Sequence, residues 1–426
     1  MTSRLLIMSE NLNRDLIDAV KCGPGAMEKI QKWLESGADV NFVRGKESPL
    51  LLAAGGGYLE VVSVLLDHGA DINMCSQPSE FNYIGGVRHL GKESALHMAA
   101  KGGHIDVVQL LLERGADLHI LSHNGETVLF PAVRHNKVEV VKMLIDRGMD
   151  VNVQNEDGDT PLIVAAVGGH GHDVEIVKLL LDAGSEIEIR DKRSRTPLLS
   201  TQFYSCSAID IARLLISHGA NINAQEKWGD TVLRNALLHH LCRDHDLYFD
   251  NNDEEMFHGL EEFIDELIEA GADLDLVDKE GRTALMKAIE WDRSKLAEKL
   301  LEAGADYHIE DKEGNTALVH AAMQHKFITK TTMLLLALDK LHPDDEGSEA
   351  KIFKKVCAVI EGKKDGKFLC SYEYCCYEDD WDYWGESYDS DEDSYNIDVL
   401  FHGDEHESVE TSFFIDVLFN IEYLLT

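Results

Sequence analysis

The sequence lacks any apolar run of the roughly 18 residues that a membrane-spanning helix requires, so we expect no such helix. Near the N-terminus the only hydrophobic run covers residues 5–8, which is too short for a secretory signal. Glycine-rich phosphate loops, the GxSxG nucleophile pattern and the HExxH zinc pattern are also missing. The sequence therefore predicts no catalytic residues, no cofactor and no metal site.

Positive charge is scarce in this chain. There are 40 Lys and Arg residues against 78 Asp and Glu residues, a net charge of −38, which argues against binding to nucleic-acid phosphates. The imbalance is largest after Lys367, because residues 368–426 contain 17 acidic residues and no basic one. The first 367 residues have a net charge of −21. We therefore expect a boundary in composition near residue 370.

The 8 cysteines are spread over a long chain, which favours reduced thiols and a cytoplasmic protein, with the nucleus as an alternative. Two groups of side chains have the chemistry of zinc ligands: His239, His240, Cys242 and His245 in one, and Cys370, Cys375 and Cys376 in the other. The first group matches no familiar zinc-finger spacing, and the second has no other cysteine pair nearby. We expect both groups to be free of metal.

Two short strings recur along most of the chain. The first has the form GADVN and begins at eight glycines: Gly37, Gly69, Gly115, Gly148, Gly184, Gly219, Gly271 and Gly304. The second has the form TPLIVA and begins at Ser48, Ser94, Thr127, Thr160, Thr196, Thr231, Thr283 and Thr316. The intervals between the glycines are mostly near 33 residues, which is typical of a solenoid built from structural repeats.

The local chemistry of one unit predicts two short helices and a turn. Thr160 is suited to cap a helix, and Pro161 to occupy its first position. The apolar spacing from residue 174 to 181 predicts a second helix, which Gly184 ends. Residues 155–158 have turn chemistry and predict a hairpin between units. Neither helix can bury its apolar face alone, so neighbouring units must stack.

These motifs resemble the ankyrin repeat, and the resemblance covers about residues 11–340. It implies an all-α ankyrin-repeat solenoid with β-hairpin loops, followed by an acidic C-terminal extension. The histidine of the family signature is present only at His97, and Leu, Phe, Ile, Arg, Met or Val replaces it in the other units. The usual histidine hydrogen-bond network is therefore expected to be mostly absent.

The chain is expected to have four regions. They are an N-terminal capping repeat at 1–43 that keeps only its second helix, about eight repeats at 44–340, a C-capping helix at 341–370, and an acidic aromatic tail at 371–426 that is partly disordered. Long intervals place one insertion at 74–91, in a loop between repeats, and another at 239–258, between the two helices of one repeat.

The resemblance also implies a partner-binding surface, since ankyrin stacks usually bind with their hairpin tips and the inward face of their first helices. The matching positions give a predicted contact set of Arg134, His135, Arg193, Arg195, Phe203, Tyr204, Trp228, Arg282 and Trp291. Aromatic residues beside arginines are typical of binding hot spots. The alternative is that some of these aromatic rings fill gaps between repeats.

The tail combines acidic and aromatic residues, as in the stretch from residue 377 to 384. Such segments can fold onto a partner, can fold back onto the basic residues of the repeats, or can serve only as a solubilising spacer. Ser390 precedes three acidic residues and is a candidate phosphorylation site.

The function that these features predict is a non-enzymatic scaffold or adaptor that binds protein partners. Two alternatives remain open: the substrate-recognition subunit of a ubiquitin ligase, although no F-box or SOCS-box pattern is present, and an effector that an intracellular bacterium or virus delivers into the host cytosol. A small enzymatic domain within 340–426 is a third alternative.

Overall fold

The computed structural model describes residues 2–45, 47–76, 92–167, 174–203, 205–239, 253–291 and 293–323. The chain divides into two units, Met1–Lys367 and Phe368–Thr426, and all described residues belong to the first. Several predicted features lie outside the described residues: most of both insertions, most of both groups of candidate zinc ligands, Tyr204, the C-capping helix, and the acidic tail with Ser390.

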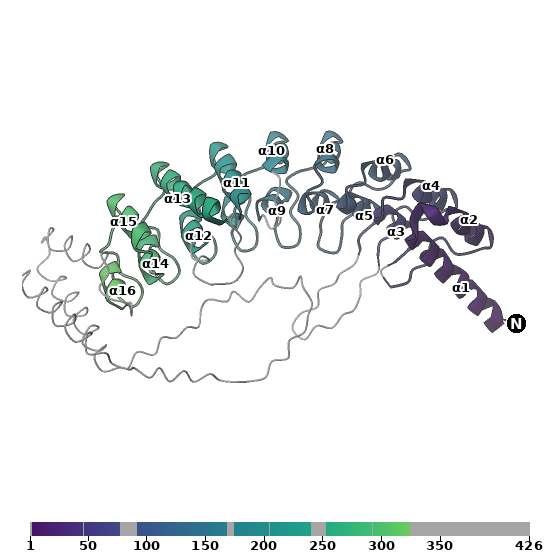
Figure 1. The fold of residues 1–426 in the computed structure, drawn as a ribbon, viewed down its shortest axis with the longest axis horizontal. Helices are drawn as coiled ribbons and strands as arrows, with labels where there is room; N and C mark the ends of the chain where they lie inside the picture. The colour runs from purple at the N-terminus through teal and green to yellow at the C-terminus, as the bar shows by residue number, and fades with distance from the viewer. Residues whose placement is uncertain are drawn as a thin grey trace, which may run out of the picture. The chain divides into compact units, whose positions relative to one another are not determined.

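The described residues form two rows of helices, one from the first helix of each repeat and one from the second (Figure 1). The first row consists of α3 (Pro49–Gly55), α5 (Ala95–Gly102), α7 (Leu129–Arg134), α9 (Pro161–Val167), η2 (Leu198–Ser200), α12 (Val232–His239), α14 (Ala284–Glu290) and α16 (Ala317–Met323). The second row consists of α4 (Leu59–Asp67), α6 (Ile105–Glu113), α8 (Val138–Asp146), α10 (Val174–Asp182), α11 (Cys206–Ser217), α13 (Asp253–Glu269) and α15 (Ser294–Glu302).

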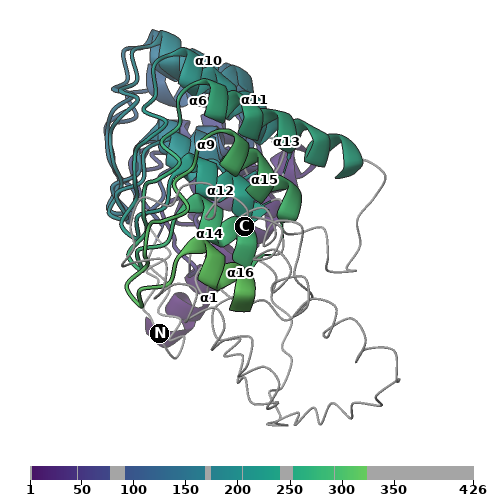
Figure 2. The ribbon, with the colours of Figure 1, turned by 90° about the vertical axis from the view of Figure 1, so that its left-hand side faces the viewer.

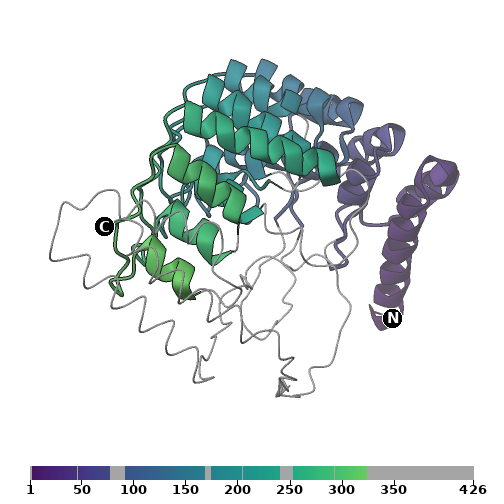
Figure 3. The same ribbon diagram turned by 60° about the vertical axis from the view of Figure 1, so that its left-hand side comes forward.

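The helices of the second row lie side by side and roughly parallel (Figure 3). Seen along the stack, the turns that join consecutive repeats gather at one edge, away from the helices (Figure 2). Two isolated β-bridges are present, but no strand occurs among the described residues. The all-α repeat solenoid predicted from the sequence is confirmed, with tight turns in place of β-hairpins.

Hydroxyl side chains start most helices of the first row. The side-chain oxygen of Thr160 accepts a hydrogen bond from the backbone N–H of Ile163 at 3.2 Å, and α9 begins at Pro161 as predicted. Ser48, Ser94, Thr196, Thr231 and Thr283 make the equivalent bond at 3.3–3.4 Å. At the other end of the repeat, Gly184 follows α10 with a φ of 87°, the left-handed conformation expected of a helix stop.

The core lies between the two rows and continues from one repeat to the next. In the unit of α9 and α10, Leu162, Ile163, Val177 and Leu180 are completely buried. Small residues such as Ala166 let the short helices approach closely. Each repeat therefore shares its apolar surface with its neighbours, which is the packing expected of a solenoid.

The N-terminal cap differs from its prediction, because it contains a first helix as well as a second. α1 (Thr2–Lys21) is followed by the 3-10 helix η1 (Gly23–Ala26) and by α2 (Met27–Glu35). α1 packs against α2 and α3, with Leu16, Ile17 and Val20 completely buried. This helix lacks the TPLIVA string, so the search for that string could not detect it.

One repeat departs from the helical pattern, and this changes the environment of a predicted contact residue. After Thr196 the chain forms only the short 3-10 helix η2, because the backbone leaves the helical path at Thr201, whose ψ is 125°. The chain then turns inward at Phe203, which is only 1% exposed. Its ring lies 5.4 Å from that of Phe263 of α13, so it fills the gap left by the missing helical turn.

Candidate protein-binding surface

The turns between repeats follow one five-residue pattern, and we call each of them a finger. The described fingers are residues 122–126, 155–159, 191–195, 226–230, 278–282 and 311–315. In four of them the first residue is Asn or Asp, and its side-chain oxygen accepts hydrogen bonds from the backbone N–H groups of the third and fifth residues. Asp191 does this at 2.9 and 2.7 Å. Such Asx turns fix the backbone of the finger without a strand.

Consecutive fingers are joined by backbone hydrogen bonds. In each pair the N–H of the second finger residue donates to a carbonyl of the preceding finger; the five donors are Glu156, Lys192, Lys227, Lys279 and Lys312, at 2.8–3.0 Å. We call this set of second-position residues the finger row. Because the backbone groups are satisfied by the neighbouring finger, the side chains of the row are presented at a regular spacing from a fixed framework.

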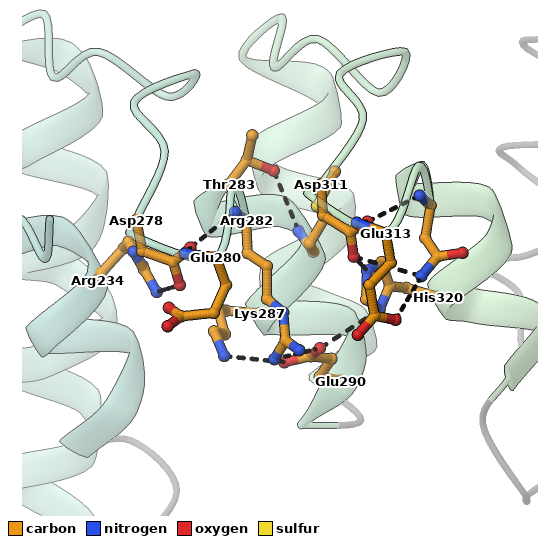
Figure 4. Close-up of polar contacts among 12 residues, drawn as sticks. Arg234, Asp278, Glu280, Arg282, Thr283, Lys287, Glu290, Asp311, Glu313 and His320 are labelled. Carbon is orange, nitrogen blue, oxygen red and sulfur yellow. Dashed lines mark hydrogen bonds and ion pairs between the residues drawn. The ribbon is translucent and has the colours of Figure 1, made fainter. Parts of the chain in front are cut away.

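In one of the later repeats an ion-paired arginine replaces the family histidine (Figure 4). His97 lies at the signature position, and its Nε2 is 3.2 Å from the backbone carbonyl of Glu126 in the next finger. Arg234 occupies the same position in its own repeat and is only 4% exposed. Its guanidinium donates to Asp278 of the next finger at 2.7 Å and lies 3.0 Å from Asp230. Both residues therefore connect one repeat to the next.

The last described repeats contain a larger polar network on the first-row helices. Glu290 lies at its centre and contacts Arg282 at 3.0 Å and Lys287 at 3.1 Å. The imidazole of His320 bridges Glu290, at 3.3 Å, and Asp311, at 2.9 Å. Burial alone would raise the pKa of Asp311, but backbone N–H groups and His320 stabilise the carboxylate and lower it. Every charge in this network faces an opposite charge or a hydrogen-bond donor.

Two described fingers do not begin with Asn or Asp: Ser122 accepts one bond, from the backbone N–H of Glu126 at 3.2 Å, and the other begins with Glu226. Its longer side chain accepts a single bond, from the backbone N–H of Trp228 at 3.1 Å. Burial, reinforced by the negative charge of Asp230, raises its pKa to about 7, and the bond from Trp228 and the charge of Arg195 offset this only partly. This carboxyl group therefore keeps its proton to a higher pH than an ordinary glutamate does.

Most of the predicted arginine contacts are already engaged within the repeats. Arg134 makes two hydrogen bonds to the carboxylate of Glu126, Arg195 bonds Asp191 at 2.7 Å, and Arg282 contacts Glu290. Arg193 differs, because among the described residues no carboxylate forms an ion pair with its side chain. His135 ends α7 and is half-buried; burial and nearby cations lower its pKa.

The predicted aromatic patch is not one surface. Phe203 is a core residue, so its prediction as a contact residue is wrong, and Tyr204 lies outside the described residues. Trp228 is in a finger, half-buried, with the ammonium groups of Lys227 and Lys279 at 5.9 and 5.8 Å from its ring. Trp291 instead follows α14, where Lys287 lies 5.7 Å from its ring. The two indoles therefore belong to different elements with separate cationic neighbours.

Sequence reasoning did not identify the perturbed carboxyl group of Glu226 or the backbone hydrogen bonds that join consecutive fingers, including the one from Lys312. A usable signal was present. The five-residue strings DKRSR, EKWGD, DKEGR and DKEGN recur at the fingers, with lysine always in second place. The pattern is visible only when the fingers are aligned with one another, because each string alone is an ordinary polar turn.

The stacked two-helix repeats, their capped first helices and the regular row of fingers define a helical repeat protein with an extended surface. A comparison with protein families agrees: the family described as ankyrin repeats, in three copies, matches residues 16–121, 96–191, 129–226 and 256–345. The chain belongs to the ankyrin-repeat family. Repeats of this kind are generally protein–protein interaction modules and are typically non-enzymatic. A search of curated proteins found no match.

Two negative findings apply to the described part of the chain. No helix there is long and apolar enough to cross a membrane. Within the same residues, no group of three or more His, Cys, Asp or Glu side chains is arranged to hold a metal ion.

Proposed function

We propose that the chain is a non-enzymatic scaffold or adaptor that binds a protein partner across its finger row and the neighbouring face of its first-row helices. The observation that carries the proposal is the backbone bonding between fingers, which presents exposed side chains from successive repeats on a fixed framework. A surface that is ordered before binding loses little conformational entropy when a partner docks. Membership of the ankyrin-repeat family supports the same conclusion.

The proposed partner is a protein, and the proposed location is the cytoplasm. The net charge of −38 disfavours nucleic acid as a direct ligand. The described cysteines Cys22, Cys75 and Cys206 are free, which supports a reducing compartment.

A photo-crosslinking residue placed in the full-length chain tests the proposal in cells. One series of variants has the crosslinker at Lys192 or Lys279 in the finger row. The control series has it at Lys142 of α8 or Lys178 of α10, which are also exposed but lie on the second row. We expect the same protein to be crosslinked from both finger positions and from neither control position. Crosslinks that form only from α8 and α10, or a finger row that crosslinks to nothing, would contradict the proposal.

A further inference from the structure

The surface around Trp228 is rich in positively charged side chains, which is unusual for this acidic chain. Lys227 and Lys279 lie near the indole, and Lys192 and Arg193 belong to the preceding finger, whose backbone is bonded to that of Lys227. We call these four cations and Trp228 the Trp228 cluster. Lys192, Lys227 and Lys279 are exposed, and Arg193 is partly exposed. Among the described residues none of the four cations forms an ion pair, although the chain has almost twice as many acidic as basic residues.

The geometry of the fingers keeps the cluster together. The backbone N–H of Lys227 donates to the carbonyl of Arg193 at 2.9 Å, and that of Lys279 donates to the carbonyl of Trp228 at 2.9 Å. The ammonium groups of Lys227 and Lys279 both lie close to the indole centroid, at 5.9 and 5.8 Å. The cations therefore stay close to one another despite their mutual repulsion.

The acidic side chains of these fingers do not neutralise the cluster. Asp191 and Asp278 are buried and are used to close their own turns, and each is bound by an arginine, Arg195 or Arg234. Farther along the row the pattern changes, since exposed Glu280 and Glu313 accompany the lysines of the last two fingers. In finger 226–230, Asp230 pairs with Arg234 at 3.0 Å, and burial of Glu226 raises the pKa of its carboxyl group. The unneutralised positive charge is therefore concentrated at Lys192, Arg193 and Lys227, whereas Lys279 is followed by the exposed Glu280.

We propose that the Trp228 cluster binds an extended acidic peptide segment of the partner, with carboxylates on the finger lysines and Arg193 and an apolar side chain against the indole. This inference rests on the proposed function and names the chemistry of the partner at the same surface. Tryptophan and arginine are the residues most enriched among binding hot spots, and complementary charge selects the partner and speeds its encounter. A polyanion such as nucleic acid is disfavoured, because the rest of the chain repels it.

The spacing of the fingers sets the register of the peptide. Neighbouring repeats lie on the order of 10 Å apart, as packed helices do. A peptide in the polyproline II conformation advances about 3.1 Å per residue with three residues per turn, so every third side chain lies on the same side. Acidic residues at every third position of the segment therefore match successive lysines of the finger row.

Fluorescence anisotropy with the full-length chain tests this proposal. The probe is a labelled synthetic peptide with glutamate at every third position, one central leucine and serine elsewhere; the control peptide has glutamine in place of glutamate. The test variant is K227E/K279E. The matched control is K142E/K178E, which makes the same change in net charge on α8 and α10.

We expect the glutamate peptide, but not the glutamine peptide, to bind the wild-type chain, with an affinity that falls as salt increases. K227E/K279E should weaken binding at least about ten-fold and K142E/K178E less than about two-fold. Trp228→Ala should weaken binding while leaving the far-UV circular dichroism spectrum unchanged. Equal losses in the two double variants would overturn the proposal, because binding would then depend only on overall charge.

Two further outcomes separate this proposal from the one on which it rests. If the glutamate peptide does not bind while the finger-row crosslinks in cells persist, the acidic-peptide proposal fails and the interaction function stands. If neither peptide binding nor finger-row crosslinking is observed, both the acidic-peptide proposal and the proposed interaction function fail. Binding of single-stranded DNA with the same dependence on Lys227 and Lys279 would also overturn the proposal, since the cluster would then be a general polyanion site.

Discussion

Glu226 begins the one described finger whose first residue is a glutamate. Asn155, Asp191, Asp278 and Asp311 close their fingers with two backbone bonds each, whereas Glu226 makes one and lies partly buried beside Asp230. The same finger carries Trp228. The carboxyl group with the raised pKa therefore lies in the same finger as the proposed binding site.

Replacing Glu226 with glutamine should make the stability of the chain less dependent on pH. The pKa of Glu226 is raised from an ordinary 4.5 to about 7, so the folded chain retains a proton that the unfolded chain releases between these values. Its contribution to stability is therefore lost as pH rises from about 4.5 to 7. The amide side chain of the Glu226→Gln variant keeps an acceptor for the backbone of Trp228 and removes the charge. At pH 8 we expect the variant to be more stable by about 1 kcal/mol, a value reduced for solvent screening.

Urea unfolding at pH 8 and pH 4.5 measures this effect, and the difference should disappear at the lower pH. Glu226→Asp is a useful companion variant, because the shorter side chain can form both turn-closing bonds, as Asp191 does. A stability difference for Glu226→Gln that is the same at both values of pH would contradict the assigned cause.

Arg234→Met should be strongly destabilising, because the change leaves the buried Asp278 without its guanidinium partner. Breaking a buried ion pair typically costs about 3–5 kcal/mol. The matched control is Arg213→Met, which breaks the exposed pair with Glu266 and should cost at most about 1 kcal/mol; the Arg213 side chain is 37% exposed against 5% for Arg234. Urea unfolding measures the free energy of unfolding of both variants.

A second substitution tests whether the uncompensated charge is the cause. Asp278→Asn removes the charge and can still close the finger, as Asn155 does. The double variant Arg234→Met with Asp278→Asn should therefore be more stable than Arg234→Met alone. If it is less stable, packing and not charge dominates at this position.

For the stability of the finger row, the close packing of neighbouring fingers matters more than the backbone conformation of any single turn. Gly229 has a φ of 88°, and a Cβ atom added there would lie 2.7 Å from the Cα of Asp278 in the next finger. Gly219 has nearly the same φ, 90°, yet an added Cβ would meet nothing within 4 Å. Comparing alanine substitutions at the two glycines therefore distinguishes the cost of backbone strain from the cost of steric contact.

Gly219→Ala should cost about 1 kcal/mol through its left-handed backbone alone. Gly229→Ala should cost at least about 2 kcal/mol, because it also pushes two fingers apart. It should weaken binding of the glutamate peptide as well, since Lys279 moves away from Trp228. Urea unfolding and anisotropy provide the two measurements, and equal stability losses would show that the fingers tolerate separation.

Across the whole described stack, stability depends on interfaces between neighbours. Leu180 of α10 and Leu16 of α1 are both completely buried, but Leu180 lies in a central repeat and Leu16 in the N-terminal cap. Leu179, which looks equivalent to Leu180 in the sequence, is only partly buried. The structure thus distinguishes two leucines that periodicity alone does not.

Leu180→Ala should cost about 2–5 kcal/mol, and Leu179→Ala less. Hydrogen exchange of the full chain should rise in repeats on both sides of α10 for Leu180→Ala. For Leu16→Ala it should rise mainly in α1, α2 and α3, because each repeat couples only to its neighbours. A uniform increase along the chain for both variants would instead indicate a single cooperative unit.

The sequence by itself determined the repeats, the starts of most first-row helices and the acidic composition, because these depend on residues close together in the chain. Tertiary structure decided which groups remain available for binding. Arg195 and Arg282 are ordinary surface cations in the sequence but are held by carboxylates in the fold, whereas the lysines of the finger row are not.

Phe203 is a second case in which the sequence did not predict the environment of a side chain, and here the reason is packing. Its position in the repeat predicts exposure, but the first helix of that repeat is short, and α13 supplies Phe263 to cover the ring. Arg234 and its partner Asp278 are 44 residues apart, with the 239–258 insertion between them. Contacts over such distances depend on how repeats stack, and local periodicity carries no information about which side chain will meet which.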